Sequence, residues 1–207
     1  MTWAWARRYR LEYLRSKKPN GRALLVVPAS LLGNWQKEAA RFVPEMRMEI
    51  LHGASAHVLE ERFSESDAFL TVTTYRVAIG LNGLQQQVRD CVILDEAQAI
   101  KNPAAKQTRQ IKKLQSRMRI AMTGTPIEND LTNLWPLFNF LDKGPLGSKD
   151  EFRNYCRRLE ERPEGYAKLK SIIQEAEVTD LFWGPVTQTG RTRPNRPDCT
   201  CKKSPFS

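Results

Sequence analysis

The chain has 207 residues, of which 41% are hydrophobic, and this size can bury one sizeable core, so we expect one main domain. No apolar run is long enough to cross a bilayer and no basic-then-apolar leader opens the sequence, which argues against the membrane and secreted classes. The net charge of +10 does not by itself indicate a DNA-binding surface, because residues 1–20 and 179–207 carry 11 Lys/Arg against three Asp/Glu, while the residues between carry 22 against 20.

Short apolar runs alternate with helical periodicity along the chain. The first run, residues 22–27, is continuously apolar after its first residue and stops at Pro28, as expected of a strand buried on both faces. Ser30 then offers an N-cap for a helix over residues 31–43. Further strands are predicted over residues 46–51, 68–73, 91–94 and 119–122. Further helices are predicted over residues 56–63, from residue 74 onward, and over residues 104–114, 130–141 and 149–159.

This alternation predicts an open, doubly wound α/β sheet with parallel connections. In such sheets the functional groups gather at the carboxyl ends of the strands. Four polar or turn clusters fall at those ends, namely Pro28, Thr73-Thr74, Asp95-Glu96 and Thr123-Gly124. We therefore expect the functional site at this edge of the sheet.

Asp95 and Glu96 follow directly after an apolar strand. A carboxylate in this position can hold Mg²⁺, largely through its water molecules, because magnesium keeps most of its hydration shell. The neighbouring carboxylate can then polarise a water for attack on a phosphoryl group. An acidic pair that caps the following helix is the alternative, since negative charge favours helix N-termini.

Two further polar groups follow the acidic pair. Gln98 could reach across a cleft, although an exposed helical glutamine explains it equally well. The run Thr123-Gly124-Thr125-Pro126 after a strand makes a sharp turn with two hydroxyl groups, and turns are where these residue types commonly occur. Each piece alone leaves both interpretations open.

The pieces in this order resemble the Swi/Snf-type family of DNA-dependent ATPases within the second helicase superfamily. Asp95-Glu96-Ala97-Gln98, followed by Ile100-Lys101-Asn102-Pro103, is similar to the family's Walker B box and its extension. Residues 123–129 resemble motif III, residues 25–32 with Asn34-Trp35 and Glu38 resemble motif Ia, and Thr73-Thr74-Tyr75 resembles motif Ib. The pattern continues at Leu134-Trp135, Leu146-Gly147 and Phe152, so that the resemblance covers residues 21–175.

The resemblance implies a RecA-like first motor lobe, an open parallel sheet with helices on both faces, that uses ATP and Mg²⁺ and moves on double-stranded DNA. Asp95 would be the magnesium carboxylate and Glu96 the residue that activates water. Gln98 would join the motif III residues in coupling the nucleotide state to lobe closure, these residues being Thr123, Gly124, Thr125 and Pro126. The sequence-independent phosphate contacts to one DNA strand would come from Pro28, Ser30, Thr73 and Thr74.

The family's phosphate loop, Gly-x-Gly-Lys-Thr, does not occur in the 207 residues, so the residues that would bind the nucleotide phosphates are unknown. Trp3-Ala4-Trp5-Ala6-Arg7-Arg8 stands where that loop is expected. Codons for residues 1–8, read from the third base, permit Asp-Met-Gly-Leu-Gly-Lys-Thr. We therefore interpret residues 1–20 as a non-family leader, out of frame at its start, that runs into a first helix, and residues 176–207 as a low-order, non-family tail.

Several alternatives stay open at this point. The family hydrolyses ATP, but without the loop lysine and the second lobe we expect this chain to be inactive by itself. A non-catalytic module that binds DNA or a protein is one alternative, and a remnant of a disrupted gene is another. The four cysteines lack zinc-site spacing, which predicts neither a metal cluster nor a disulfide framework. We expect a cytoplasmic protein, associated with the nucleoid in a bacterium, or a nuclear protein in a eukaryote.

Overall fold

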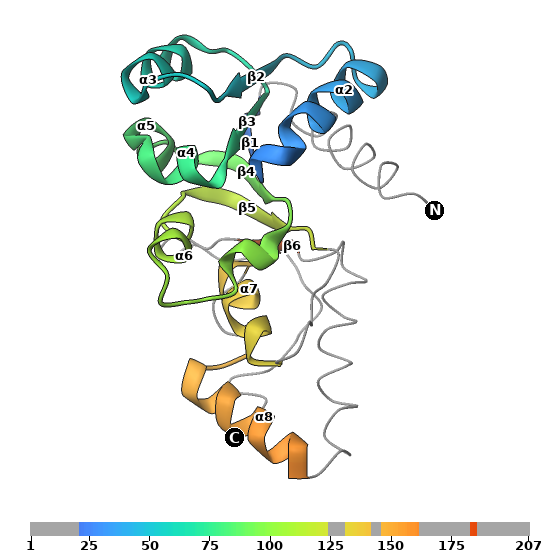
Figure 1. The fold of residues 1–207 in the computed structure, drawn as a ribbon, viewed down its shortest axis with the longest axis vertical. Helices are drawn as coiled ribbons and strands as arrows, with labels where there is room; N and C mark the ends of the chain where they lie inside the picture. Colours follow the sequence, from blue (N-terminus) through green and yellow to red (C-terminus); the bar gives the residue numbers. More distant parts are fainter. Residues whose placement is uncertain (1–20, 124–130, 142–145, 162–182, 186–207) are drawn as a thin grey trace.

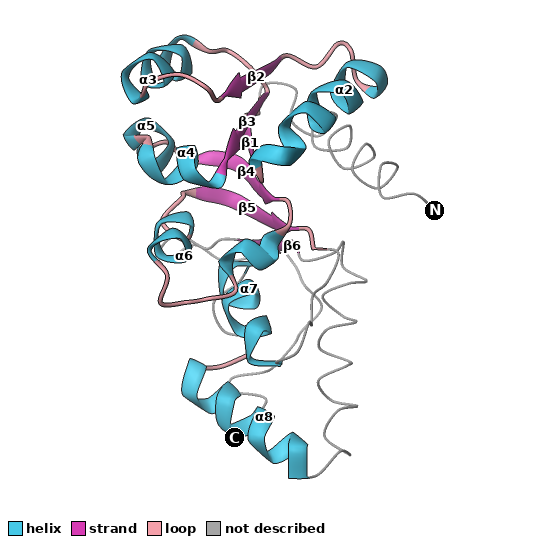
Figure 2. Cartoon of the chain, viewed as in Figure 1, coloured by secondary structure: helices cyan, strands magenta, loops and turns pink. Residues whose placement is uncertain are grey.

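The computed structural model describes residues 21–123, 131–141, 146–161 and 183–185. Its centre is a six-stranded sheet with the order β2-β3-β1-β4-β5-β6 (Figures 1 and 2). The strands are β1 (Ala23–Val27), β2 (Met48–Leu51), β3 (Leu70–Thr74), β4 (Arg89–Leu94), β5 (Ser116–Ala121) and β6 (Trp183–Pro185). The first five strands are parallel, which confirms the predicted sheet, whereas β6 pairs antiparallel with β5 and has no counterpart in the prediction.

The helices lie in the connections between strands. The longer helices are α2 (Leu32–Phe42), α3 (Ala56–Glu65), α7 (Leu134–Leu141) and α8 (Lys149–Glu161). The shorter helices are α4 (Tyr75–Gly80), α5 (Asn82–Gln86) and α6 (Lys106–Ile111). Three single 3₁₀ turns accompany them, namely η1 (Ala29–Leu31), η2 (Ala97–Ile100) and η3 (Leu131–Asn133).

The two faces of the sheet carry separate apolar cores, because side chains along a strand alternate between faces. In β1, Leu24 and Val26 join the core that packs against α3 to α8, while Leu25 and Val27 join the core under α2. Figure 1 shows α2 on one side of the sheet and α3, α4 and α5 on the other. All five residues of β1 are buried, as the continuous apolar run predicts for a strand covered on both faces. The predicted arrangement with helices on both faces is confirmed.

The prediction that Ser30 caps the first long helix is wrong. Pro28 precedes the 3₁₀ turn η1, and Leu31 is the N-cap of α2, with no side-chain capping hydrogen bond at either position. Ser30 lies inside the turn and is exposed. Because Ser30 lies within this turn, α2 begins later than a cap at Ser30 would require, and Leu31 occupies the N-cap position.

Several boundaries differ from the prediction for identifiable reasons. β5 begins at Ser116 rather than at residue 119, because the polar Ser116 and the charged Arg117 give no apolar signal at its start. The helix predicted over residues 104–114 is only the short α6, and α5 has no counterpart in the prediction. By contrast, the short helix expected from residue 74 is present as α4, with the Thr74 hydroxyl accepting a hydrogen bond from the Val77 N–H.

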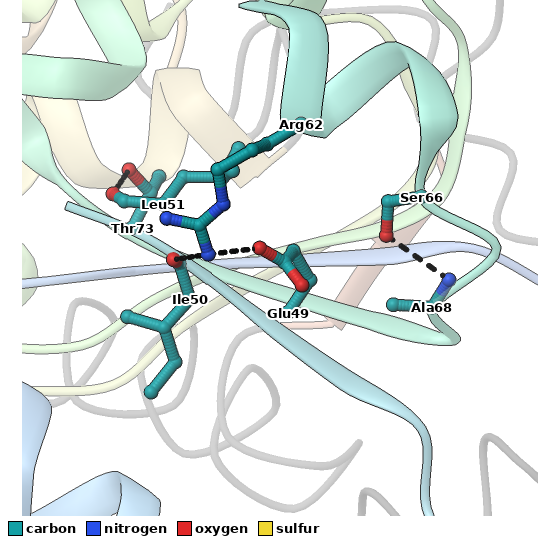
Figure 3. A network of polar contacts seen from close by, with 7 residues as sticks. All are labelled: Glu49, Ile50, Leu51, Arg62, Ser66, Ala68 and Thr73. Atoms are coloured by element: carbon teal, nitrogen blue, oxygen red, sulfur yellow. Dashed lines mark hydrogen bonds and ion pairs between the residues drawn. The ribbon is translucent and has the colours of Figure 1, made fainter. Parts of the chain in front are cut away.

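The outer edge of β2 is covered by a side chain from α3 (Figure 3). The Arg47 carbonyl accepts a hydrogen bond from the Leu70 N–H of β3, so by the alternation of a parallel ladder the Ile50 carbonyl faces away from β3. Arg62 donates to this Ile50 carbonyl across 3.0 Å and also forms an ion pair with Glu49. The edge carbonyl therefore has a partner from the same chain.

No helix in the described part of the chain is long and apolar enough to cross a membrane.

Candidate functional site

Asp95 is the first residue after β4 and lies at the carboxyl edge of the sheet. Its N–H donates to the Val26 carbonyl of β1 across 2.8 Å. On the other side of β4, the Met122 N–H donates to the Leu94 carbonyl across 2.8 Å, and the Ala97 N–H donates to the Met122 carbonyl across 2.8 Å. The backbone around Asp95 is therefore fixed between the ends of β1 and β5, where the sequence predicts the site.

The carboxylate of Asp95 is held at both oxygens. The indole nitrogen Nε1 of Trp35 donates to Oδ2 across 2.7 Å, and the Glu96 N–H donates to Oδ1 across 3.1 Å. Asp95 and Trp35 are only 1% and 3% exposed. A buried carboxylate needs such donors, because an unpaired charge away from water is costly. The two bonds leave the carboxylate one preferred orientation.

The side chain of Tyr75 contacts the backbone of Asp95. Its phenol O–H donates to the Asp95 carbonyl oxygen across 2.8 Å in a buried position. Burial raises the pKa of the Tyr75 phenol far above its usual range, and the negative charges of Asp95 and Glu96 add to this. Tyr75 therefore remains a neutral hydrogen-bond donor at any physiological pH.

Glu96 has a backbone conformation that non-glycine residues rarely adopt. Its φ of 50° and ψ of 53° place it in the left-handed region, and it is the one non-glycine residue with positive φ in the described ranges. This conformation costs on the order of 1 kcal/mol for a residue with a Cβ. Glu96 is the N-cap of the 3₁₀ turn η2, and its side chain makes no capping hydrogen bond there.

A chain of hydrogen bonds runs from Glu96 to the end of β5. The side-chain amide of Gln98 donates from Nε2 to Oε2 of Glu96 across 2.6 Å. The Thr123 hydroxyl donates to Oε1 of the same Gln98 side chain across 2.8 Å. The structure thus brings together Asp95, Glu96, Gln98 and Thr123, while Gly124, Thr125 and Pro126 lie outside the described residues.

The other predicted strand-end residues occupy two different environments. Ser30 is exposed and Pro28 is half-buried, so both reach the surface at the end of β1. Thr73 is 0% exposed, and its hydroxyl donates to the Leu51 carbonyl across 2.8 Å (Figure 3). Thr74 is also buried, and its hydroxyl accepts the capping bond from Val77. The two threonine hydroxyls thus have partners inside the lobe.

Two residues of the site, Trp35 and Tyr75, were not assigned a role by the sequence. Both lie in segments that resemble family motifs, but neither residue type suggests a contact with a carboxylate by itself. A signal was available, because a tryptophan or tyrosine on a buried helix face needs a hydrogen-bond partner for its polar atom. Sequence spacing does not say which partner that is.

The donor set of the site is consistent with magnesium. Among the described residues, no group of three or more His, Cys, Asp or Glu side chains is arranged to hold a metal ion. Mg²⁺ does not need such a group, since it is commonly bound by one or two carboxylates together with water and substrate phosphates. Asp95, with Glu96 beside it, supplies the hard oxygen ligands of that arrangement.

Comparison with known proteins identifies relatives of this chain. A family model described as the SNF2-related domain matches residues 9–181. The putative ATP-dependent helicase/translocase YwqA of Bacillus subtilis is 37% identical over 140 residues, which cover 67% of this chain and 15% of that protein. The TATA-binding protein-associated factor MOT1 of Saccharomyces cerevisiae is 34% identical over 174 residues, which cover 82% of this chain and 9% of that protein.

Two solved structures share the fold. The SWI2/SNF2 ATPase core of Sulfolobus solfataricus in complex with dsDNA matches with a TM-score of 0.70 and 32% identity, over 80% of this chain and 35% of that one. The core domain of the same organism matches with a TM-score of 0.67 and 32% identity, over 79% of this chain and 34% of that one. The chain thus spans about a third of each solved core and less of the curated relatives. It belongs to the SNF2-related family of the second helicase superfamily, and its parallel sheet is a RecA-like lobe of that family's ATPase core.

Proposed function

We propose that this chain is the ATP-handling first lobe of a DNA-dependent motor, with residues 21–175 forming the lobe, residues 1–20 a leader and residues 176–207 a tail. The observation that carries the proposal is the buried Asp95 carboxylate, fixed at both oxygens at the carboxyl edge of a parallel sheet. Such an edge is where α/β proteins of this kind bind nucleotides. The family membership and the matching ATPase cores support the assignment.

Asp95 and Glu96 have different roles in this proposal. Asp95 would bind Mg²⁺ through its fixed carboxylate, largely by way of water ligands. The bound Mg²⁺ and ATP would supply the transferable phosphoryl group and neutralise part of its charge. Glu96, in its left-handed conformation, would orient and polarise the attacking water. The strained backbone is consistent with this role, because strain of this kind persists where a side chain must point in a set direction.

Gln98 and Thr123 would couple the nucleotide state of this site to the rest of the motor. The bonds from Glu96 through Gln98 to Thr123 join the catalytic edge to the segment that begins at the end of β5. We propose that Gly124, Thr125 and Pro126 continue this path toward lobe closure. A change in the hydrogen bonding of Glu96 would then alter the start of that segment.

Contacts with double-stranded DNA would come from the strand ends beside the site. Ser30 is exposed and Pro28 is half-buried, so these residues can approach a phosphate directly. Thr73 and Thr74, whose hydroxyls have partners within the lobe, would act by shaping the edge rather than by touching a phosphate themselves. Such contacts are independent of base sequence and weaken as salt rises. The protein would act in the compartment that holds the DNA, the bacterial cytoplasm or the eukaryotic nucleus.

We further propose that the isolated chain does not hydrolyse ATP. The sequence contains no Gly-x-Gly-Lys-Thr, so the backbone cradle and the lysine that stabilise the transferred phosphoryl are not provided by a recognisable motif. The test is phosphate release with and without duplex DNA, compared with the Glu96→Gln variant. DNA-stimulated release above that variant would contradict inactivity. Sequencing the gene tests whether the leader is an out-of-frame phosphate loop, in which case codons 1–8 should encode Gly-Lys-Thr when they are read from the third base.

A non-catalytic module is the second candidate, and the missing phosphate loop favours it. In that case the strand-end edge would still bind duplex DNA, and binding measured by fluorescence anisotropy would survive Asp95→Asn and Glu96→Gln. Aggregated protein without a cooperative unfolding transition would instead indicate a gene remnant. A folded protein that binds DNA in a salt-dependent manner contradicts the gene-remnant interpretation and is expected of both the lobe and the non-catalytic module.

A further inference from the structure

We propose that Trp35 and Tyr75 are positioning residues that hold the Asp95 carboxylate for its divalent cation. This inference rests on the magnesium role of Asp95 proposed above. It adds two side chains from different helices, neither of which would touch the nucleotide. Trp35 makes a hydrogen bond to the carboxylate of Asp95, and Tyr75 makes one to its backbone carbonyl.

Trp35 fixes the rotation of the carboxylate. Its indole donates to Oδ2 across 2.7 Å, a short distance for N–H···O that is typical of bonds to charged acceptors. The ring is fixed in turn by the core under α2, where Leu32, Ala39 and Val43 are buried with it. A closely packed aromatic ring cannot follow a rotating carboxylate, so the carboxylate keeps the orientation that the indole sets.

Tyr75 fixes the backbone from the other face of the sheet. It is the first residue of α4, whose start is held by the bond from the Val77 N–H to Thr74. Its ring lies in the core that α3 to α8 cover, opposite the core that holds Trp35. The phenol O–H then fixes the Asp95 carbonyl across 2.8 Å.

Asp95 is therefore the point where three elements meet. β1 holds its N–H through Val26, α2 holds its carboxylate through Trp35, and α4 holds its carbonyl through Tyr75. The turn before α2 begins directly after Pro28, and α4 begins directly after Thr74. The helices that follow the two strand ends proposed to face DNA are thus each joined to Asp95 by one side-chain hydrogen bond.

The test measures cation binding rather than activity. Mn²⁺, used in place of Mg²⁺, is titrated into the full chain and the free ion is measured by electron paramagnetic resonance. We expect Trp35→Phe and Tyr75→Phe each to weaken Mn²⁺ binding by at least about five-fold, which corresponds to the loss of one hydrogen bond. Tyr75→Phe removes a single oxygen atom and preserves the ring, so it keeps the test valid where Trp35→Phe disturbs folding.

Matched controls separate positioning from general stability. Trp135→Phe removes an indole that donates to the Gly147 carbonyl, and Tyr155→Phe removes a half-buried phenol of α8, and neither should change Mn²⁺ binding. Circular dichroism shows which variants are folded. A second readout is the indole N–H signal of Trp35 in a ¹⁵N NMR spectrum, which Mn²⁺ should broaden more than that of Trp135 and which Asp95→Asn should move.

The outcomes distinguish the two proposals. Equal Mn²⁺ affinity in the wild-type chain and in both folded Phe variants overturns the positioning role and leaves the metal role of Asp95 intact. Mn²⁺ binding that is unaffected by Asp95→Asn, with no selective broadening at Trp35, overturns the metal role and the positioning role together. Weakened binding in both variants with unchanged controls supports the inference.

Discussion

Thr123 donates its hydroxyl to Oε1 of Gln98 across 2.8 Å, and this bond connects the end of β5 to the 3₁₀ turn η2 that follows the acidic pair. The same Gln98 side chain donates to Glu96 across 2.6 Å. The oxygen of this amide therefore accepts a hydrogen bond from the end of β5, and its nitrogen donates one to the end of β4. The contact with Glu96 fixes the orientation of the amide, because a flip would place the amide oxygen against a carboxylate oxygen, where neither atom can donate.

Replacing Thr123 by valine tests this bond. Valine keeps the shape of the side chain but leaves Oε1 of Gln98 without the Thr123 donor, which should lower the free energy of unfolding by about 1 kcal/mol. Thr123→Ser keeps the hydroxyl and should stay closer to the wild type. Urea unfolding followed by circular dichroism measures both. A valine variant as stable as the serine variant would show that the bond contributes little.

Substitution of Arg119 should lower the free energy of unfolding more than most substitutions in the lobe. Its guanidinium donates to the carbonyls of Phe140, Leu114 and Lys112 across 2.9, 2.7 and 3.2 Å, although burial lowers its pKa to about 10. Arg119→Met leaves three carbonyls without this donor and should cost about 3 kcal/mol.

Arg117, two residues earlier in the same strand, is the matched control for Arg119. Its side chain is 71% exposed and pairs with Asp90 at 3.4 Å, so Arg117→Met should change the free energy of unfolding by less than about 0.5 kcal/mol. Thermal or urea unfolding of the two Met variants gives the comparison. Equal losses for the two variants would contradict a special role for the buried guanidinium.

Two glycines in helices should respond in opposite directions to alanine. A Cβ on Gly83 would meet Oε2 of Glu60 at 2.6 Å and the Phe63 ring at 2.9 Å, so Gly83→Ala should destabilise the lobe by about 1–3 kcal/mol. A Cβ on Gly33 in α2 meets nothing within 4 Å, so Gly33→Ala should be neutral or stabilise by up to about 1 kcal/mol. Differential scanning calorimetry measures both. A stabilised Gly83→Ala variant would show that α5 can move away from α3.

The buried thiol of Cys91 should make stability depend on alkaline pH. Burial raises the pKa of this thiol well above its ordinary value of 9.0, and the neighbouring Asp90 adds to the effect. The folded chain keeps the proton while the unfolded chain releases it, so stability is fully present below pH 9 and falls as pH rises further.

Cys91→Ala should remove the Cys91 part of this pH dependence. Above pH 9 the wild-type free energy of unfolding should fall more steeply than that of the variant, by up to about 1.4 kcal/mol per pH unit. The variant should be less stable at pH 7 because of lost packing, and the two curves should approach each other toward pH 11. Parallel curves from pH 8 to 11 would show that the thiol does not titrate differently in the two states.

The sequence predicts the sheet well because strands buried on both faces leave continuous apolar runs, as in β1 and β4. It also predicts that Asp95, Glu96 and Thr123 come together, because parallel strands place their carboxyl ends at one edge. The start of β5 could not be predicted, since Ser116 and Arg117 give no apolar signal and belong to the strand only through its pairing with β4.

The bonds of Trp35 and Tyr75 to Asp95 could not be predicted for a related reason. They join residues 60 and 20 positions apart, and only the packed positions of α2 and α4 decide which polar atoms meet. For Ser30 the sequence predicted a contact that the structure lacks. The preference of serine for helix N-caps predicted a cap at this position, where the chain instead forms a short 3₁₀ turn. Local chemistry thus predicts where polar groups stand along the chain, and tertiary packing decides what they contact.

The Arg62 side chain over the edge of β2 also affects how copies of this chain can associate. An uncovered edge strand invites a strand of another molecule to pair with it, a common route to sheet extension and aggregation. Here the outward Ile50 carbonyl already accepts a hydrogen bond from Arg62, and Glu49 holds that guanidinium in place. An incoming strand would have to displace a charge from its ion pair before a backbone bond to the Ile50 carbonyl could form. Self-assembly by strand addition is therefore disfavoured at β2.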